Sequence, residues 1–108
     1  MAEWTKEMMD AETIECARYG DAEDLRALLT DGADVNSIDG TGTTALHMAA
    51  ANGQVECLEI LKSFNAVHKA NAGGNFPLHW AVQNGQLLAF QFLCANYQVD
   101  VLVKNNLG

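Results

Sequence analysis

The sequence predicts an all-α fold, a solenoid of stacked helix-turn-helix units joined by short β-hairpin loops. Two segments with the same pattern, Gly42–Gly53 and Gly74–Gly85, start 74 − 42 = 32 residues apart. Each contains Leu-His-x-Ala and ends in Asn-Gly. A fixed period of this length is typical of arrays in which neighbouring repeats stack on one another. Glycine or asparagine also recurs where helices should end, at positions that favour a left-handed backbone.

The N-terminal residues 1–12 are expected to form a capping segment. Trp4, Met8 and Ala11 have helical spacing with acidic residues between them, which indicates an amphipathic helix. Such a helix would cover the apolar end of the stack, as terminal units of repeat arrays do. A helix that docks onto a partner is the alternative interpretation.

Residues 13–41 are predicted to form the first repeat, of the type that begins an array. Gly20 marks the turn between two short helices, and Gly32 marks the end of the second. The apolar faces of these helices are expected to consist of Ile14, Ala17, Leu25, Leu28 and Leu29. The two helices should therefore pack against each other as an antiparallel pair.

Residues 42–73 are predicted to form the second repeat. The preceding loop, Asp39–Gly42, has the composition of a hairpin turn. Thr44 is placed to cap the next helix by accepting a hydrogen bond from the backbone N–H of His47. Asn65 stands where glycine would end the second helix, and asparagine tolerates the left-handed conformation that this position needs.

Residues 74–107 are predicted to form the third repeat. Phe76 replaces the threonine cap, while Pro77 suits the first helical position. The two apolar faces are expected to contain Leu78, Ala81, Val82, Leu87, Phe90, Phe92 and Leu93. The segment Asn105–Gly108 repeats the motif of the earlier loops, so the array is expected to continue beyond residue 108.

The pattern Gly-x-Thr-Ala/Pro-Leu-His-x-Ala followed by Asn-Gly, with the loop Gly-Ala-Asp-Val-Asn at 32–36, resembles the ankyrin repeat over almost the whole chain. The resemblance implies that His47 ties its loop together, and that partners bind the hairpin tips and the concave side of the inner helices. The candidate contacts are Ile38, Gly40, Thr41, Thr43, Ala51, Asn52, Ala70, Ala72, Asn75, Trp80, Gln83 and Asn84. Trp80 has two interpretations, as a packing residue or as a partner contact.

Charge and motifs favour binding over chemistry. Lys and Arg number 6 against 14 acids, a net charge of −8 that repels nucleic acid and anionic membranes and favours a basic partner. No Cys-x-x-Cys, His-x-x-x-His or Asp-x-Asp-x-Asp spacing is present, so we expect no metal, no cofactor and no catalytic residue. Three widely spaced cysteines, at 16, 57 and 94, suit a reducing compartment. His68 is expected to be solvated, with a pKa near about 6.5.

We therefore predict a non-catalytic protein–protein interaction module that works as an adaptor or scaffold. We expect it to be monomeric and to lie in the cytoplasm, with the nucleus as an alternative location. Two alternatives remain. The sequence is also similar to a fungal ankyrin chaperone of a basic ribosomal protein, a client that suits the net charge of −8. The segment Val99–Gly108 resembles ankyrin segments that precede a methyltransferase domain, which would make the chain the recognition module of a larger enzyme. Binding that falls steeply with salt would favour a basic client.

Overall fold

The structure is a computed structural model that describes residues 3–99. It contains the helices α1 (Lys6–Tyr19), α2 (Ala22–Thr30), α3 (Ala45–Ala51), α4 (Val55–Ser63), α5 (Pro77–Gln83) and α6 (Leu87–Asn96). No β-strand occurs within residues 3–99, so the predicted hairpins are tight turns without extended strand pairing. In the same range, no helix has both the length and the apolar character needed to cross a membrane.

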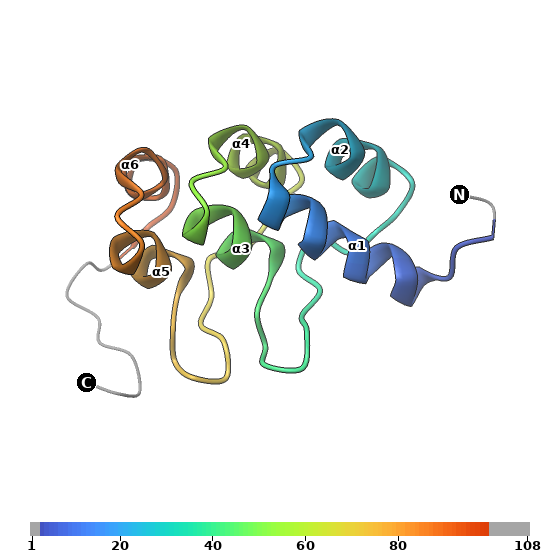
Figure 1. The fold of residues 1–108 in the computed structure, drawn as a ribbon, viewed down its shortest axis with the longest axis horizontal. Helices are drawn as coiled ribbons and strands as arrows, with labels where there is room; N and C mark the ends of the chain where they lie inside the picture. Colours follow the sequence, from blue (N-terminus) through green and yellow to red (C-terminus); the bar gives the residue numbers. More distant parts are fainter. Residues whose placement is uncertain (1–2, 100–108) are drawn as a thin grey trace.

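The helices form two layers (Figure 1). Helices α1, α3 and α5 pack side by side in an inner layer, and α2, α4 and α6 form an outer layer over them. The loops that precede α3 and α5 extend away from the outer layer, beyond the inner helices. We call these loops finger 1 (residues 39–43) and finger 2 (residues 71–75). The all-α repeat fold predicted from the sequence is confirmed.

Capping residues determine where the helices begin and end. The hydroxyl of Thr5 accepts the Met8 N–H at 3.1 Å and starts α1, and Gly20 ends it with φ +80°. Pro77 occupies the first position of α5. After α4, Asn65 has φ +68°, the left-handed conformation predicted for it.

The N-terminal helix differs from the expected lead-in helix. Helix α1 runs without a break from Lys6 to Tyr19, across the predicted boundary at residues 12 and 13. Trp4 precedes the helix and is 37% exposed, Met8 is 48% exposed and Ala11 is exposed, so these three residues do not form the apolar face of the predicted amphipathic helix. Met9 packs against the core in their place.

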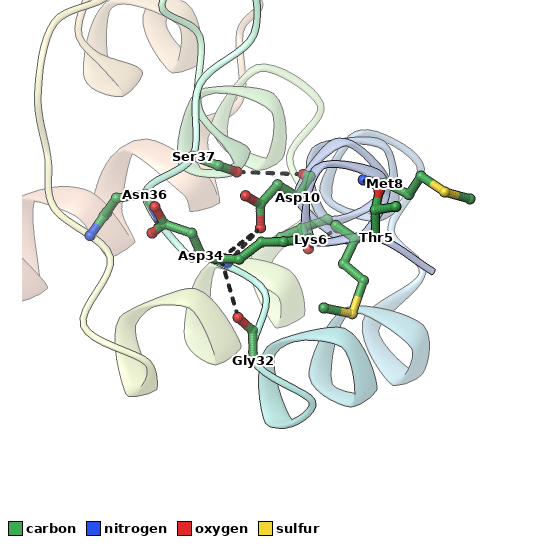
Figure 2. A network of polar contacts seen from close by, with 10 residues as sticks. Thr5, Lys6, Met8, Asp10, Gly32, Asp34, Asn36 and Ser37 are labelled. Carbon is green, nitrogen blue, oxygen red and sulfur yellow. Dashed lines mark hydrogen bonds and ion pairs between the residues drawn. The ribbon is translucent and has the colours of Figure 1, made fainter. Parts of the chain in front are cut away.

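Polar contacts attach α1 to the loop that leads to finger 1 (Figure 2). One carboxylate oxygen of Asp10 accepts the Asp34 N–H at 2.8 Å, and the Ser37 hydroxyl donates to the Asp10 carbonyl at 3.4 Å. Lys6 donates to the carbonyl of Gly32 at 3.4 Å and pairs with Asp10 at 3.3 Å. These contacts hold the first half of α1 against the loop that follows α2.

A glycine and a glutamine form each junction between consecutive repeats. The side chain of Gln54 packs onto Gly20, where an added β-carbon would lie 2.5 Å from its Oε1, and Gln86 packs onto Gly53 in the same way. The Gln54 amide also donates to the carbonyl of Arg18 at 3.3 Å. Gly20 and Gly53 adopt left-handed φ values of +80° and +68°, which favour glycine, and the absent side chain leaves the space that the glutamine amide fills.

The core lies between the two layers. Its fully buried leucines recur at equivalent positions of the repeats and are Leu25, Leu28, Leu46, Leu58, Leu61 and Leu93. Leu78 is also buried, as predicted. Val82 and Leu87 are 59% and 64% exposed, so the prediction that they belong to buried faces is wrong. They lie on the side of the third repeat where no described residue stacks.

The repeat boundaries 1–12, 13–41, 42–73 and 74–107 stay predictions. Residues 100–108, which include Asn105–Gly108 and most of the segment Val99–Gly108, lie outside the described part of the chain.

Candidate functional site

Finger 1 is closed by the carboxylate of Asp39. One of its oxygens, Oδ1, accepts the Thr41 N–H at 2.8 Å, the Thr41 hydroxyl at 2.7 Å and the Thr43 N–H at 3.1 Å. The Asp39 N–H donates to the carbonyl of Thr43 at 3.0 Å. Partial burial works in the opposite direction, but the hydrogen bonds from Thr41 and Thr43 hold the pKa of Asp39 below its usual value. The finger therefore carries a negative charge at neutral pH.

Finger 2 has the same construction with a neutral side chain. The amide oxygen of Asn71 accepts the N–H groups of Gly73 and Asn75, both at 3.0 Å. The tips of the two fingers are joined, because the Ala72 N–H donates to the carbonyl of Thr41 at 2.9 Å. Gly42 has φ +78°, and an added β-carbon would lie 2.9 Å from the Ala72 nitrogen. Together the fingers form a continuous row of fixed turns.

His47 connects finger 2 to the second repeat. Its Nδ1 accepts the backbone N–H of Thr44 at 3.2 Å, and its own N–H donates to the Thr44 hydroxyl at 3.3 Å, so the predicted cap is confirmed. With Nδ1 as acceptor, Nε2 carries the proton and donates to the carbonyl of Asn75 at 2.6 Å. Burial lowers the pKa of His47, which keeps the ring neutral. The tie implied by the resemblance is therefore present, and it also spans two repeats.

The third repeat retains part of this arrangement. Phe76 has no side-chain oxygen, but its N–H donates to Nδ1 of His79 at 2.9 Å. His68 is not solvated as predicted, because it stacks on Phe76 with ring centroids 5.2 Å apart and lies 5.8 Å from the ring of Tyr97. Its Nε2 accepts the Leu78 N–H at 3.2 Å. Burial lowers the pKa of His68 to about 4, so it is a packing residue and is neutral near pH 7.

The predicted contact residues are distributed unevenly over the surface. The exposed ones are Ile38, Gly40, Thr41, Asn52, Ala70, Ala72, Gln83 and Asn84, and the half-buried ones are Ala51, Asn75 and Trp80. Thr43 is 1% exposed and its hydroxyl lies 2.9 Å from that of Thr41, so its side chain is a support within the finger and not a surface contact. The ring of Trp80 meets His47 edge-on with centroids 5.2 Å apart.

A groove beside finger 1 contains residues that sequence reasoning missed. It has a volume of about 320 Å³ and lies between α1 and residues 37–39. The residues of α1 that line it are Glu7, Asp10, Ala11, Ile14, Glu15 and Arg18. Their spacing of three and four residues is that of one helix face. The signal was present in the sequence, but a separate capping helix was assumed to end at residue 12.

The described residues offer little for chemistry. Within residues 3–99, no three His, Cys, Asp or Glu side chains are grouped as metal ligands. Burial raises the pKa of the Cys16 thiol to about 12 and that of the Cys57 thiol to about 11. Both thiols are buried, and neither is a nucleophile at neutral pH.

The repeated helix pairs, the bonded fingers and the histidine ties can now be compared with known proteins. A family model for ankyrin repeats in three copies matches residues 13–105. The chain belongs to the ankyrin repeat family. Ankyrin repeats are protein-interaction modules, and the ankyrin repeat domain is typically non-catalytic.

Several curated proteins share this segment. The chain is 33% identical over 75 residues to human ankyrin repeat domain-containing protein 63, covering 68% of this chain and 20% of that protein. It is 34% identical over 85 residues to the palmitoyltransferase Hip14 of Drosophila melanogaster, covering 76% and 13%. It is also 34% identical over 93 residues to human transient receptor potential cation channel subfamily A member 1, covering 77% and 8%. The chain thus spans a fifth or less of the length of these relatives.

Proposed function

We propose that this ankyrin repeat chain works as an adaptor that binds a protein partner with its fingers and the adjacent inner-helix face. The observation that carries the proposal is the bonded row of finger tips. Exposed residues Gly40, Thr41, Ala70 and Ala72 lie on loops whose backbone is held by Asp39, Asn71 and the bond between the tips. A surface that is already ordered loses little conformational entropy when it binds.

Site-specific photo-crosslinking tests this proposal. The photoreactive amino acid p-benzoylphenylalanine would replace exposed Ala70, which directly precedes finger 2, and, as a matched control, exposed Glu59 on the outer helix α4. The natural host cell is irradiated and the adducts are compared. We expect a distinct set of adducts from position 70 and none of these from position 59. The same adducts in equal yield from both positions would refute binding through the fingers.

A substitution at Trp80 distinguishes its two interpretations, as a packing residue or as a partner contact. Its edge contact with His47 supports the packing interpretation. Trp80→Ala is therefore expected to lower the melting temperature, by the loss of a partly buried aromatic ring. An unchanged melting temperature together with lost adducts at position 70 would instead make Trp80 a partner contact.

The relatives support a binding module that belongs to larger proteins of different function. One is named a palmitoyltransferase and another a cation channel, yet each matches this chain over 13% or less of its own length. The recognition module of a larger enzyme therefore remains the second candidate. The monomeric state, the cytoplasmic location and a basic partner also remain predictions. Size-exclusion chromatography with light scattering checks the first of these.

A further inference from the structure

We propose that the groove between α1 and residues 37–39 binds a basic segment of a partner protein, with an apolar side chain on its floor and Lys or Arg side chains at its acidic rim. The inference rests on the proposed function and specifies where one partner segment would lie. It adds the inner helix α1 to the predicted contact residues, which lie on or beside the fingers, α3 and α5.

The groove has an apolar floor and a fixed wall. Ala11, Ile14 and Ile38 contribute the apolar atoms, and Ile38 is 57% exposed on the finger side. The hydrogen bonds that Asp10 makes with Asp34 and Ser37 hold this wall against α1 (Figure 2). The volume of about 320 Å³ is at the lower end of the roughly 300–1,000 Å³ found for ligand pockets. The floor can therefore take a side chain and leaves the rest of the segment at the rim.

The charge of the rim is unbalanced. Asp10 is paired with Lys6 at 3.3 Å, and Glu15 is paired with Arg18 at 3.6 Å. Glu7 and Asp39 form no ion pair with any cation in the described part of the chain, although Arg18, which also lines the groove, helps to lower the pKa of Asp39. A cationic side chain of a partner would supply the missing charge at both positions, close to apolar surface that lowers the local dielectric constant.

Asp39 is suited to this role by its hydrogen bonds. All three bonds that close finger 1 go to Oδ1, and no described residue donates to Oδ2. A partner can therefore contact Oδ2 without breaking the turn. An anionic ligand would meet uncompensated carboxylates, and a small inorganic cation would leave the exposed Ile38 uncovered.

Peptide binding tests the proposal. The probe is a short fluorescein-labelled peptide in which Arg residues flank a central Leu, titrated by anisotropy at low salt against the intact chain. The test variant is Glu7→Gln with Asp39→Asn, and Asn71 shows that an asparagine can close the same turn. The control variant is Glu56→Gln with Glu59→Gln, which removes two exposed acids from α4. Both variants change the net charge equally.

We expect the groove variant to weaken binding about three- to tenfold and the control variant less than about twofold. Replacing the central Leu of the peptide by Ser should weaken binding as well. Equal losses for both variants would overturn the proposal, because general attraction to an acidic protein would then be sufficient. No effect of the Leu replacement would also overturn it. Crosslinking at position 70 does not involve the groove, so its outcome reports on the proposed function separately.

Discussion

His47→Ala should destabilise the protein strongly, because one buried ring satisfies groups in two repeats. The substitution leaves the Thr44 N–H without the ring nitrogen that accepts it, and it removes one of the hydrogen bonds to the Asn75 carbonyl, which keeps the Asn71 N–H at 2.9 Å. The unpaired N–H costs about 1–3 kcal/mol and the lost hydrogen bond to Asn75 about 0.5–1.5 kcal/mol, and the fully buried ring leaves a cavity that adds to the loss. Asn75 is half-buried and can recover water, and alanine favours a helix by about 0.5 kcal/mol, so both effects reduce the sum. We expect a net loss of about 2–5 kcal/mol in the free energy of unfolding.

Urea denaturation followed by far-ultraviolet circular dichroism measures this loss. Asn52→Ala is the matched control, since Asn52 lies at the end of the same helix, is exposed and makes a hydrogen bond to the carbonyl of Met48. We expect the control to change stability by no more than about 0.5 kcal/mol. A loss below about 1 kcal/mol for His47→Ala would refute the reasoning, because the tie between repeats would then contribute nothing beyond an exposed contact.

Three further predictions concern titration, backbone and thiols. Burial lowers the pKa of His68 from 6.5 to about 4, so the unfolded chain binds more protons between these values and stability should fall as the pH drops from about 6.5 to about 4. His68→Gln should make stability, measured as the urea midpoint, depend less steeply on pH in this range. An unchanged pH dependence in the variant would contradict the prediction. Gly85→Ala should lower the free energy of unfolding by about 1–2 kcal/mol, because an alanine there would need a φ of +67°. Gly42→Ala should lower it more, since the added β-carbon would also meet the backbone of Ala72. Equal losses of stability in thermal melts would argue against contact between the fingers. Iodoacetamide should label exposed Cys94 in the folded protein and label Cys16 and Cys57 only in urea, as peptide mass spectrometry would show. Rapid labelling of all three in the folded state would show that the core opens readily.

Helix caps and turn conformations could be predicted from the sequence, because each depends on residues only a few positions apart. Thr44 and His47 are three residues apart, and the cap between them follows from that spacing. Asn65 adopts the left-handed conformation that its position after a helix requires. The repeat fold followed from the period. These features depend on short-range geometry and needed no knowledge of neighbouring repeats.

The burial of residues at equivalent positions of different repeats could not be predicted in this way. Ala50 and Val82 are equivalent in the second and third repeats, yet Ala50 is completely buried and Val82 is 59% exposed. The difference arises because the third repeat stacks on the second, whereas no described residue stacks on the third. His68 was misjudged for a similar reason, since Tyr97 packs against it from a distant part of the chain. The groove was missed because α1 was divided at residue 12 and because its two walls come from different segments.

The junctions made by glycine and glutamine restrict the order in which the repeats can be joined, because the two residues come from different repeats. Gly53 is followed by Gln54, and Gly85 is followed by Gln86, so the second and third repeats each carry a glycine next to the glutamine that packs onto the previous repeat, although only Gly20 and Gly53 meet a glutamine within the described residues. Gly20 is followed by Asp21, so the first repeat presents only the glycine. Recombination could exchange the second and third repeats and keep both junctions, whereas moving the first repeat inward would remove one.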